Sequence, residues 1–249
     1  LNGWSAHDAA STQVIDHSEF TQFLQSYSQV SGGIRRIDYE SALPERARLD
    51  RYVAQLQGTD PLNLNRDEQR AYWINLYNAE TIRVILDHYP VESIKDINLE
   101  GSGLFGGPWN APRLTVNGEA LSLNNIEHGI LRPLWADPRI HYAVNCASLG
   151  CPNLAAEAYT AVNSETLLEA QARDFVAHPR GVAIEEDGDV RLSNIYLWYR
   201  KDFGRSDREV LDHVAAYASP ERAGQLKAAD SIDSYDYDWR LNNPTNAYK

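Results

Sequence analysis

Apolar side chains fill most positions between residues 71 and 86 and leave little polar face. A helix that is apolar almost all round lies inside a protein. Asn65 is a good N-cap residue for such a helix, so the pattern predicts a central helix over 66–88. Asn75 and Asn78 lie on it three residues apart. We expect both amides to be buried and hydrogen-bonded, since an unpaired buried amide costs about 1–3 kcal/mol. They would either tie down neighbouring backbone or bind substrate.

Shorter patterns predict the remaining elements. Asn117-Gly118 and Asp187-Gly188 are turn signals between β-forming segments, and the segment 139–145 is itself rich in β-formers. Helices on both sides of a mainly antiparallel set of strands indicate an α+β fold in a single domain over 1–249. The other expected helices are 18–30, 42–57, 123–132, 164–177, 207–217 and 220–228. The expected strands are 113–116, 119–122, 139–145, 182–185 and 190–192.

Composition narrows the classes of partner. The chain has 249 residues, 43% hydrophobic, and carries a net charge of −12. An acidic chain without a visible basic face is a poor partner for nucleic acids or anionic membranes. No apolar run reaches the length of about 18 residues needed for a membrane span. The chain begins Leu-Asn-Gly and contains no Met, which predicts a processed, exported protein in the periplasm or outside the cell, with the cytoplasm as the alternative.

The Gly- and Pro-rich stretch 101–112 is the clearest loop. Loops of this length often act as lids or binding loops. Trp109 lies in this loop, and we expect it either to bind substrate or to be one buried aromatic in a connector.

The segment 124–152 concentrates chemistry, because it holds both cysteines and two of the seven histidines. A thiol nucleophile needs an imidazole to take its proton. Cys146 ends a predicted strand, and His128 lies on a predicted helix, so the two could face each other. Either Glu127 or an Asn could be the group that orients His128.

The same residues allow two other sites. Cys146 and Cys151 are separated by four residues, and a turn at Gly150 could bring them together as a disulfide. A variant is a reversible disulfide that masks the nucleophile. His128, His141 and the two cysteines could bind zinc, but their spacing is irregular for a structural zinc site. We expect no metal and no cofactor.

Several ordered motifs between residues 68 and 204 resemble the domain of unknown function 547 family. They are YWINLYNA at 72–79, LSLNNIEHGILR at 121–132, RIHYAVNCAS at 139–148 and LSNIYLWYRKDFG at 192–204. Helical and C-terminal extensions would flank this core. The resemblance implies a bacterial protein whose core motifs include Glu127, His128 and Cys146. It also favours the nucleophile over an obligatory disulfide, since plant relatives carry Ser at the position of Cys151.

These observations together predict a thiol-dependent hydrolase or acyl transferase. Its expected substrate is a peptide, an amide or a small thiol peptide such as glutathione, and its fold would be related to papain-like or transglutaminase-like cysteine enzymes. The alternative is a binding module with a Cys146–Cys151 disulfide. The expected catalytic residues are Cys146, His128 and Glu127. The expected substrate-binding residues are Asn75, Asn78, Asn145, Trp109 and Arg132.

Overall fold

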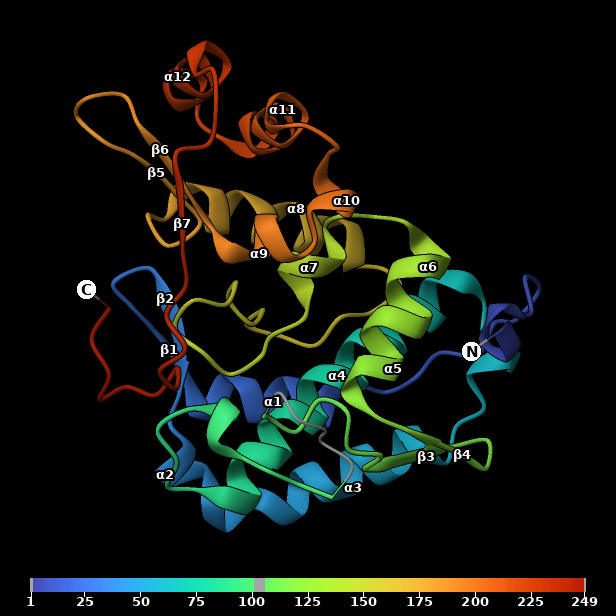
Figure 1. Ribbon diagram of the computed structural model, residues 1–249. Helices are drawn as coiled ribbons and strands as arrows, with labels where there is room; N and C mark the ends of the chain where they lie inside the picture. The colour runs from blue at the N-terminus through green and yellow to red at the C-terminus, as the bar shows by residue number, and fades with distance from the viewer. Residues whose placement is uncertain (1, 101–105, 249) are drawn as a thin grey trace.

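The structure, a computed structural model, describes residues 2–100 and 106–248 (Figure 1). The first half of the predicted loop 101–112 therefore lies outside the described residues. The helices are α1 (Ser18–Tyr27), α2 (Tyr39–Ala42), α3 (Arg46–Gln57), α4 (Arg66–His88), α5 (Leu123–Ile126), α6 (Arg132–Trp135), α7 (Ile140–Ala143), α8 (Ser164–Ala177), α9 (Asn194–Trp198), α10 (Arg200–Phe203), α11 (Asp207–Tyr217) and α12 (Pro220–Ala228). The strands are β1 (Ser28–Ser31), β2 (Ile34–Ile37), β3 (Leu114–Val116), β4 (Glu119–Leu121), β5 (Val182–Ile184), β6 (Val190–Ser193) and β7 (Ser234–Asp236).

The predicted central helix is confirmed as α4, with the same bounds. The side chain of Asn65 caps it by accepting the backbone N–H of Glu68 at 3.0 Å. α4 packs against α3 and α5, and nearly all of its side chains are buried. It is thus the central helix of the larger apolar core, and later segments of the chain pack against it.

Capping residues also define the helices that follow. The predicted helices 164–177, 207–217 and 220–228 are α8, α11 and α12, and the side chains of Ser206 and Ser219 cap the last two. The predicted helix 18–30 ends earlier, at Tyr27, because the next residues pair as β1 with β2. The predicted helix 123–132 is α5 followed by a π-helical turn, Glu127–Leu131.

The fold is α+β, as predicted, but its strands form three small sheets instead of one. β1 and β2, β3 and β4, and β5 and β6 are antiparallel pairs, and β7 joins β6 in parallel. Asn117 and Gly118 both have positive φ, as a two-residue hairpin turn requires.

The predicted strand over 139–145 is wrong, because this segment contains the short helix α7. All four residues of α7 are buried, so no polar face marks the helical period. The side chain of Asp137 accepts the backbone N–H of Arg139 and fixes the turn before the helix. The β-forming side chains here serve core packing.

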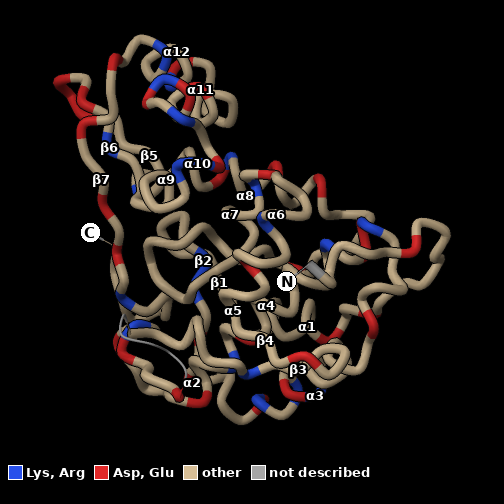
Figure 2. Tube along the Cα trace, turned by 45° about the vertical axis from the view of Figure 1, so that its right-hand side comes forward, with Lys and Arg blue, Asp and Glu red and all other residues tan. Residues whose placement is uncertain are grey.

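Two buried apolar clusters organise the chain. The larger one surrounds α4 and includes residues from α1, α3 and α5, while the smaller one lies among α8, α11 and β6. Figures 1 and 2 show α8–α12 and β5–β7 on one side of the molecule and α1–α4 on the other. α7 and the segment after it lie between these two parts, and the buried Tyr142 of α7 belongs to the smaller cluster.

Acidic and basic residues are interspersed along the chain (Figure 2). Among the described residues, no helix combines the length and the apolar character that crossing a membrane would require.

A buried histidine gives the fold a pH dependence. Burial lowers the pKa of His17 from 6.5 to about 4, and its Nδ1 lies 2.5 Å from the hydroxyl of Tyr52. The unfolded chain therefore binds one more proton between pH 6.5 and 4. The stability that neutral His17 contributes is fully present above pH 6.5 and is lost as pH falls through this window.

We expect urea unfolding at pH 5 to show a loss from this group of about 2 kcal/mol relative to pH 7.5. His17→Phe should remove that part of the pH dependence. His7→Ala, at an exposed position, should leave the dependence as in the wild type. Parallel pH profiles for wild type and His17→Phe would contradict the assignment.

Candidate functional site

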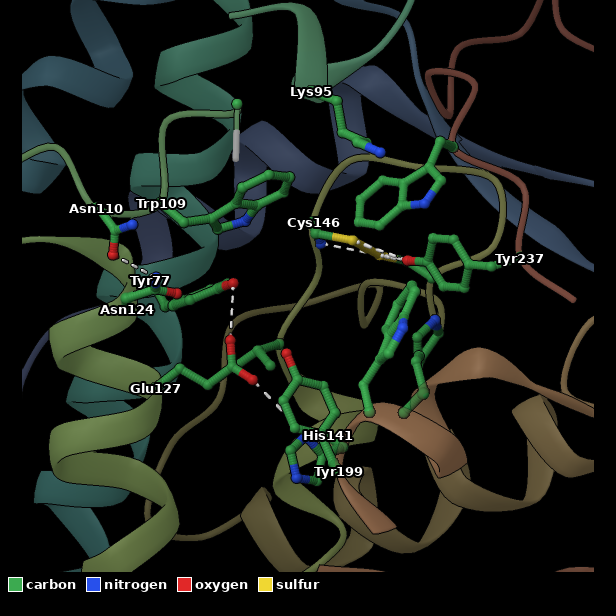
Figure 3. A pocket seen from close by; sticks show the side chains of 17 residues that line it. Tyr77, Lys95, Trp109, Asn110, Asn124, Glu127, His141, Cys146, Tyr199 and Tyr237 are labelled. Carbon is green, nitrogen blue, oxygen red and sulfur yellow. Dashed lines mark hydrogen bonds and ion pairs between the residues drawn. A yellow bond between two sulfur atoms is a disulfide. The ribbon is translucent and has the colours of Figure 1, made fainter. Parts of the chain in front are cut away.

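A pocket of about 380 Å³ opens where α4, α9 and the C-terminal segment meet (Figure 3). It combines one acid, one ammonium, one imidazole, two sulfurs and several aromatic rings. Its lining residues are Tyr77, Lys95, Gly106, Trp109, Asn110, Asn124, Glu127, His141, Val144, Cys146, Cys151, Pro152, Ile195, Trp198, Tyr199, Tyr237 and Trp239.

Cys146 and Cys151 form a disulfide in the wall of this pocket. Cys146 is partly exposed, whereas Cys151 is only 3% exposed. The turn between them is tied to the C-terminal segment, since the backbone N–H of Leu149 donates to Arg240 and that of Gly150 donates to Asp238, both at 2.8 Å. The two sulfurs are therefore held by backbone contacts as well as by their own bond.

Asn78 holds the residues just before Cys146. Its amide donates to the carbonyl of Ala143 at 2.9 Å, and its Oδ1 accepts the backbone N–H of Asn145 at 2.9 Å. The side chain of Asn145 then accepts the N–H of Ala147, a residue with φ of +59°. The central helix thus sets the position of the sulfur through an amide clamp on the backbone.

Two hydroxyl groups surround the disulfide. The hydroxyl of Tyr237 lies 2.9 Å from the sulfur of Cys146, 3.0 Å from that of Cys151 and 2.8 Å from the hydroxyl of Ser148. Burial raises the pKa of Tyr237 well above its ordinary value, so the phenol keeps its proton and can donate it.

Glu127 lies on the wall across from the sulfurs (Figure 3). Its side chain is nearly buried, and its Oε2 accepts the hydroxyl of Tyr77 at 3.1 Å. The pKa values of Tyr77 and Tyr199 are raised. Burial is the largest cause, and the charge of Glu127 is the second. Both phenols therefore remain neutral donors facing a carboxylate.

His141 links Glu127 to a second carboxylate. Its Nε2 lies 2.7 Å from Oδ2 of Asp202, and its Nδ1 lies 3.7 Å from Oε1 of Glu127. The hydrogen bond from His141 is the main cause of the lowered pKa of Asp202, which Arg132 also contacts at 2.6 Å. Since Asp202 is ionised, a neutral His141 carries its proton on Nε2. Nδ1 is then the acceptor on the side of Glu127.

His128 lies outside the set of residues that line the pocket. Its Nδ1 is 3.0 Å from the guanidinium of Arg132, its ring contacts Tyr199, and its side chain is 35% exposed. The π-helical turn carries Glu127 into the pocket and turns the next side chain away. The histidine that shares the pocket with Cys146 is His141.

Aromatic rings form the other walls. Trp239 contacts Trp109, Trp198 and Tyr237 with ring centres 5.7, 5.5 and 4.7 Å apart. The ammonium of Lys95 lies 5.0 Å from the centre of the Trp239 ring. Such walls suit a ligand with flat or apolar surface and at least one polar end.

The other predicted site residues support the pocket from outside. Asn75 and Asn78 are buried and hydrogen-bonded, as predicted, but neither is among the lining residues. Asn75 clamps the backbone of Tyr159 through bonds of 2.7 and 2.9 Å. Asn145 supports the cysteine turn, and Arg132 pairs with Asp202. Trp109 does line the pocket, as does Glu127.

Comparison with known proteins finds a family match for part of the chain. Residues 61–176 match the family model described as "Protein of unknown function, DUF547". This match covers less than half of the 249-residue chain. No curated protein and no solved structure matches the chain.

The DUF547 segment supplies only part of the pocket. Tyr77, Glu127, His141 and both cysteines lie inside 61–176, while the residues that complete the walls follow it: Ile195, Trp198, Tyr199, Tyr237 and Trp239. Figure 3 shows Tyr237 on the opposite side of the cavity from the helix that carries Glu127, and Tyr199 beside Glu127 and His141. The pocket therefore depends on the chain beyond the DUF547 match.

Sequence reasoning missed several of these residues. The motif 192–204 contained Trp198, Tyr199 and Asp202, and the C-terminal segment contained Tyr237 and Trp239. The concentration of aromatic residues in these two segments could have indicated a ligand-binding wall, but the sequence analysis assigned no role to these residues. Lys95 carried no local signal. Among the residues that the structure describes, no group of three or more His, Cys, Asp or Glu side chains could hold a metal ion.

Proposed function

We propose that this pocket is the active site of a thiol-dependent hydrolase or acyl transferase that works in the reduced state. Its substrate would be a peptide, an amide or a small thiol peptide such as glutathione. The observation that supports this most directly is that the partly exposed sulfur of Cys146 shares one pocket with His141, whose other ring nitrogen is hydrogen-bonded to Asp202. A nucleophile and an oriented base in one cavity are what acyl transfer through a thiol requires.

In the proposed reaction, the Cys146 thiol gives its proton to Nδ1 of His141, directly or through one water. The thiolate attacks the carbonyl carbon of the substrate. The bond to the leaving group then breaks, and the leaving group takes the proton from His141. Water or a second amine releases the acyl group from sulfur. Asp202 keeps the imidazole oriented throughout, and Glu127 stabilises its charged form.

A distant relationship to papain-like or transglutaminase-like cysteine enzymes is part of this proposal. Its support is the set of residue types alone: a thiol, an imidazole and a carboxylate. Export to the periplasm or the cell exterior is also proposed. A Cys146–Cys151 disulfide persists in such compartments, so the acyl-transfer reaction there requires a reductant that first opens this bond.

A binding module is the second candidate. The disulfide favours it, because a sulfur in that bond cannot attack a carbonyl carbon. The hydroxyls of Tyr237 and Ser148 lie within hydrogen-bond distance of both sulfurs. In this role the aromatic walls and Lys95 would hold a ligand without changing it.

Trapping of an acyl-enzyme separates the two candidates. We expect Cys151→Ala, which leaves Cys146 unable to form the disulfide, to gain one acyl group from a small acyl thioester at pH 7. Intact mass after an acid quench, followed by peptide mapping, would place the group on Cys146. The double variant Cys146→Ala/Cys151→Ala is the matched control and should gain none. Acylation of Cys146 no faster than that of free cysteine would support the binding module.

A further inference from the structure

The two sulfurs of the pocket differ in access. Cys146 is partly exposed, and Cys151 is 3% exposed, although both contribute to the wall. A thiolate that breaks a disulfide must reach the sulfur that it attacks. A small thiol entering the pocket therefore meets Cys146 first.

The two sulfurs also differ in their hydrogen-bond donors. The sulfur of Cys151 accepts the backbone N–H of Cys146 at 3.0 Å and the hydroxyl of Ser148 at 3.4 Å, with the hydroxyl of Tyr237 at 3.0 Å. Within residues 2–100 and 106–248, the sulfur of Cys146 has the two hydroxyls within hydrogen-bond distance but no backbone N–H. Hydrogen bonds to an ionised acceptor are the strong ones, so these donors favour a thiolate on Cys151.

The turn would keep its shape after the bond breaks. Leu149 and Gly150 remain bonded to the backbone of Arg240 and Asp238, and a Cβ at Gly150 would lie 2.8 Å from the backbone nitrogen of Asp238. Because the turn packs this closely on the C-terminal segment, the sulfur of Cys151 stays beside Cys146. It can then attack a mixed disulfide formed there.

We propose that this pocket carries out thiol–disulfide exchange with a low-molecular-weight thiol, with Cys146 as the attacked sulfur and Cys151 as the leaving and resolving thiol. This activity goes beyond the acyl transfer proposed above and does not depend on it. It rests on the unequal access and donor sets of the two sulfurs in a pocket of about 380 Å³.

The exchange balances without a further reactant. A thiolate RS⁻ attacks the sulfur of Cys146, the Cys146–Cys151 bond breaks, and its electron pair passes to Cys151. A second RS⁻ attacks the RS sulfur of the mixed disulfide, so that RSSR forms and Cys146 leaves as a thiolate. Two thiols are oxidised, and the protein disulfide is reduced to two thiols. The reverse sequence consumes RSSR and restores the disulfide.

The single-cysteine variants test which sulfur exchanges. Reduced Cys151→Ala and Cys146→Ala are each mixed with 2-hydroxyethyl disulfide, and the mass gain of one mercaptoethanol group is followed over time. We expect the adduct on Cys151→Ala to form at least ten times faster than that on Cys146→Ala. Equal rates, or a faster reaction in Cys146→Ala, would overturn the proposal. Neither measurement involves an acyl substrate, so the outcome is separate from that of the acyl-enzyme experiment.

A second measurement uses the intact pair of cysteines and tests the leaving thiol. 2-Mercaptoethanol is added to oxidised protein, and free thiols are blocked with excess N-ethylmaleimide at pH 7. We expect mercaptoethanol on Cys146 and N-ethylmaleimide on Cys151. Tyr237→Phe should slow this step several-fold, whereas Tyr235→Phe, in the same strand region, should not. The opposite labelling pattern, or equal rates for the two tyrosine variants, would rule out the assigned roles.

Discussion

Asn78→Leu should lower the free energy of unfolding by about 2–6 kcal/mol. The substitution keeps a similar volume but leaves the carbonyl of Ala143 and the N–H of Asn145 without their partner. Each buried polar group that loses its hydrogen bond costs about 1–3 kcal/mol. Urea unfolding followed by far-UV circular dichroism would measure the change.

Asn63→Leu is the matched control, because Asn63 is exposed and its side-chain amide donates to Asp60 rather than to buried backbone. Its unfolding free energy should stay within about 0.5 kcal/mol of the wild type. If Asn78→Leu behaves in the same way, the clamp on the cysteine segment contributes nothing to the fold.

His141→Gln should slow acylation of Cys146 by at least about 100-fold, measured in the Cys151→Ala background. A positioned general base contributes roughly 10²–10⁴ to rate, and Nδ1 of His141 is the acceptor that the pocket provides. Asp202→Asn should give a smaller loss, because the imidazole stays in the pocket without its orienting carboxylate.

His128→Gln is the comparison that decides between the two histidines. This residue lies outside the pocket lining, so its substitution should change the rate by no more than about threefold. Thermal unfolding of each variant would show that the fold is retained. A large loss in His128→Gln with a small one in His141→Gln would restore the pairing that the sequence predicted.

Local signals in the sequence were enough for the long helices. α4, α8, α11 and α12 have the predicted bounds, and side-chain caps mark the starts of three of them: Asn65 for α4, Ser206 for α11 and Ser219 for α12. The strand prediction for 139–145 was wrong because no such signal was present. All four residues of α7 are buried, so the sequence shows no alternation of apolar and polar positions at the helical period. Propensity alone then favoured the strand.

The site was predictable only where its residues lie in one motif. Glu127 and Cys146 were identified from a single segment, but their neighbours Lys95, Tyr199 and Tyr237 are brought in by the fold from far along the chain. The choice between a free thiol and a disulfide at Cys146 could not be read from spacing. The state of Cys146 depends on how the cysteine turn packs against residues 237–242. The spacing of the two cysteines contains no information about that distant segment.

The division of the pocket along the chain has a consequence for how such proteins diversify. The two sulfurs, Glu127 and His141 belong to the DUF547 match, whereas Asp202 and much of the opposite wall belong to residues after it. Changes at wall positions such as Ile195, Trp198 or Trp239 would therefore alter what the cavity accepts, while Asp202 and the backbone of residues 238–240 keep the imidazole and the sulfurs in place. Under the proposed function, two chains that share residues like 61–176 but differ at those wall positions would keep one chemistry and serve different ligands.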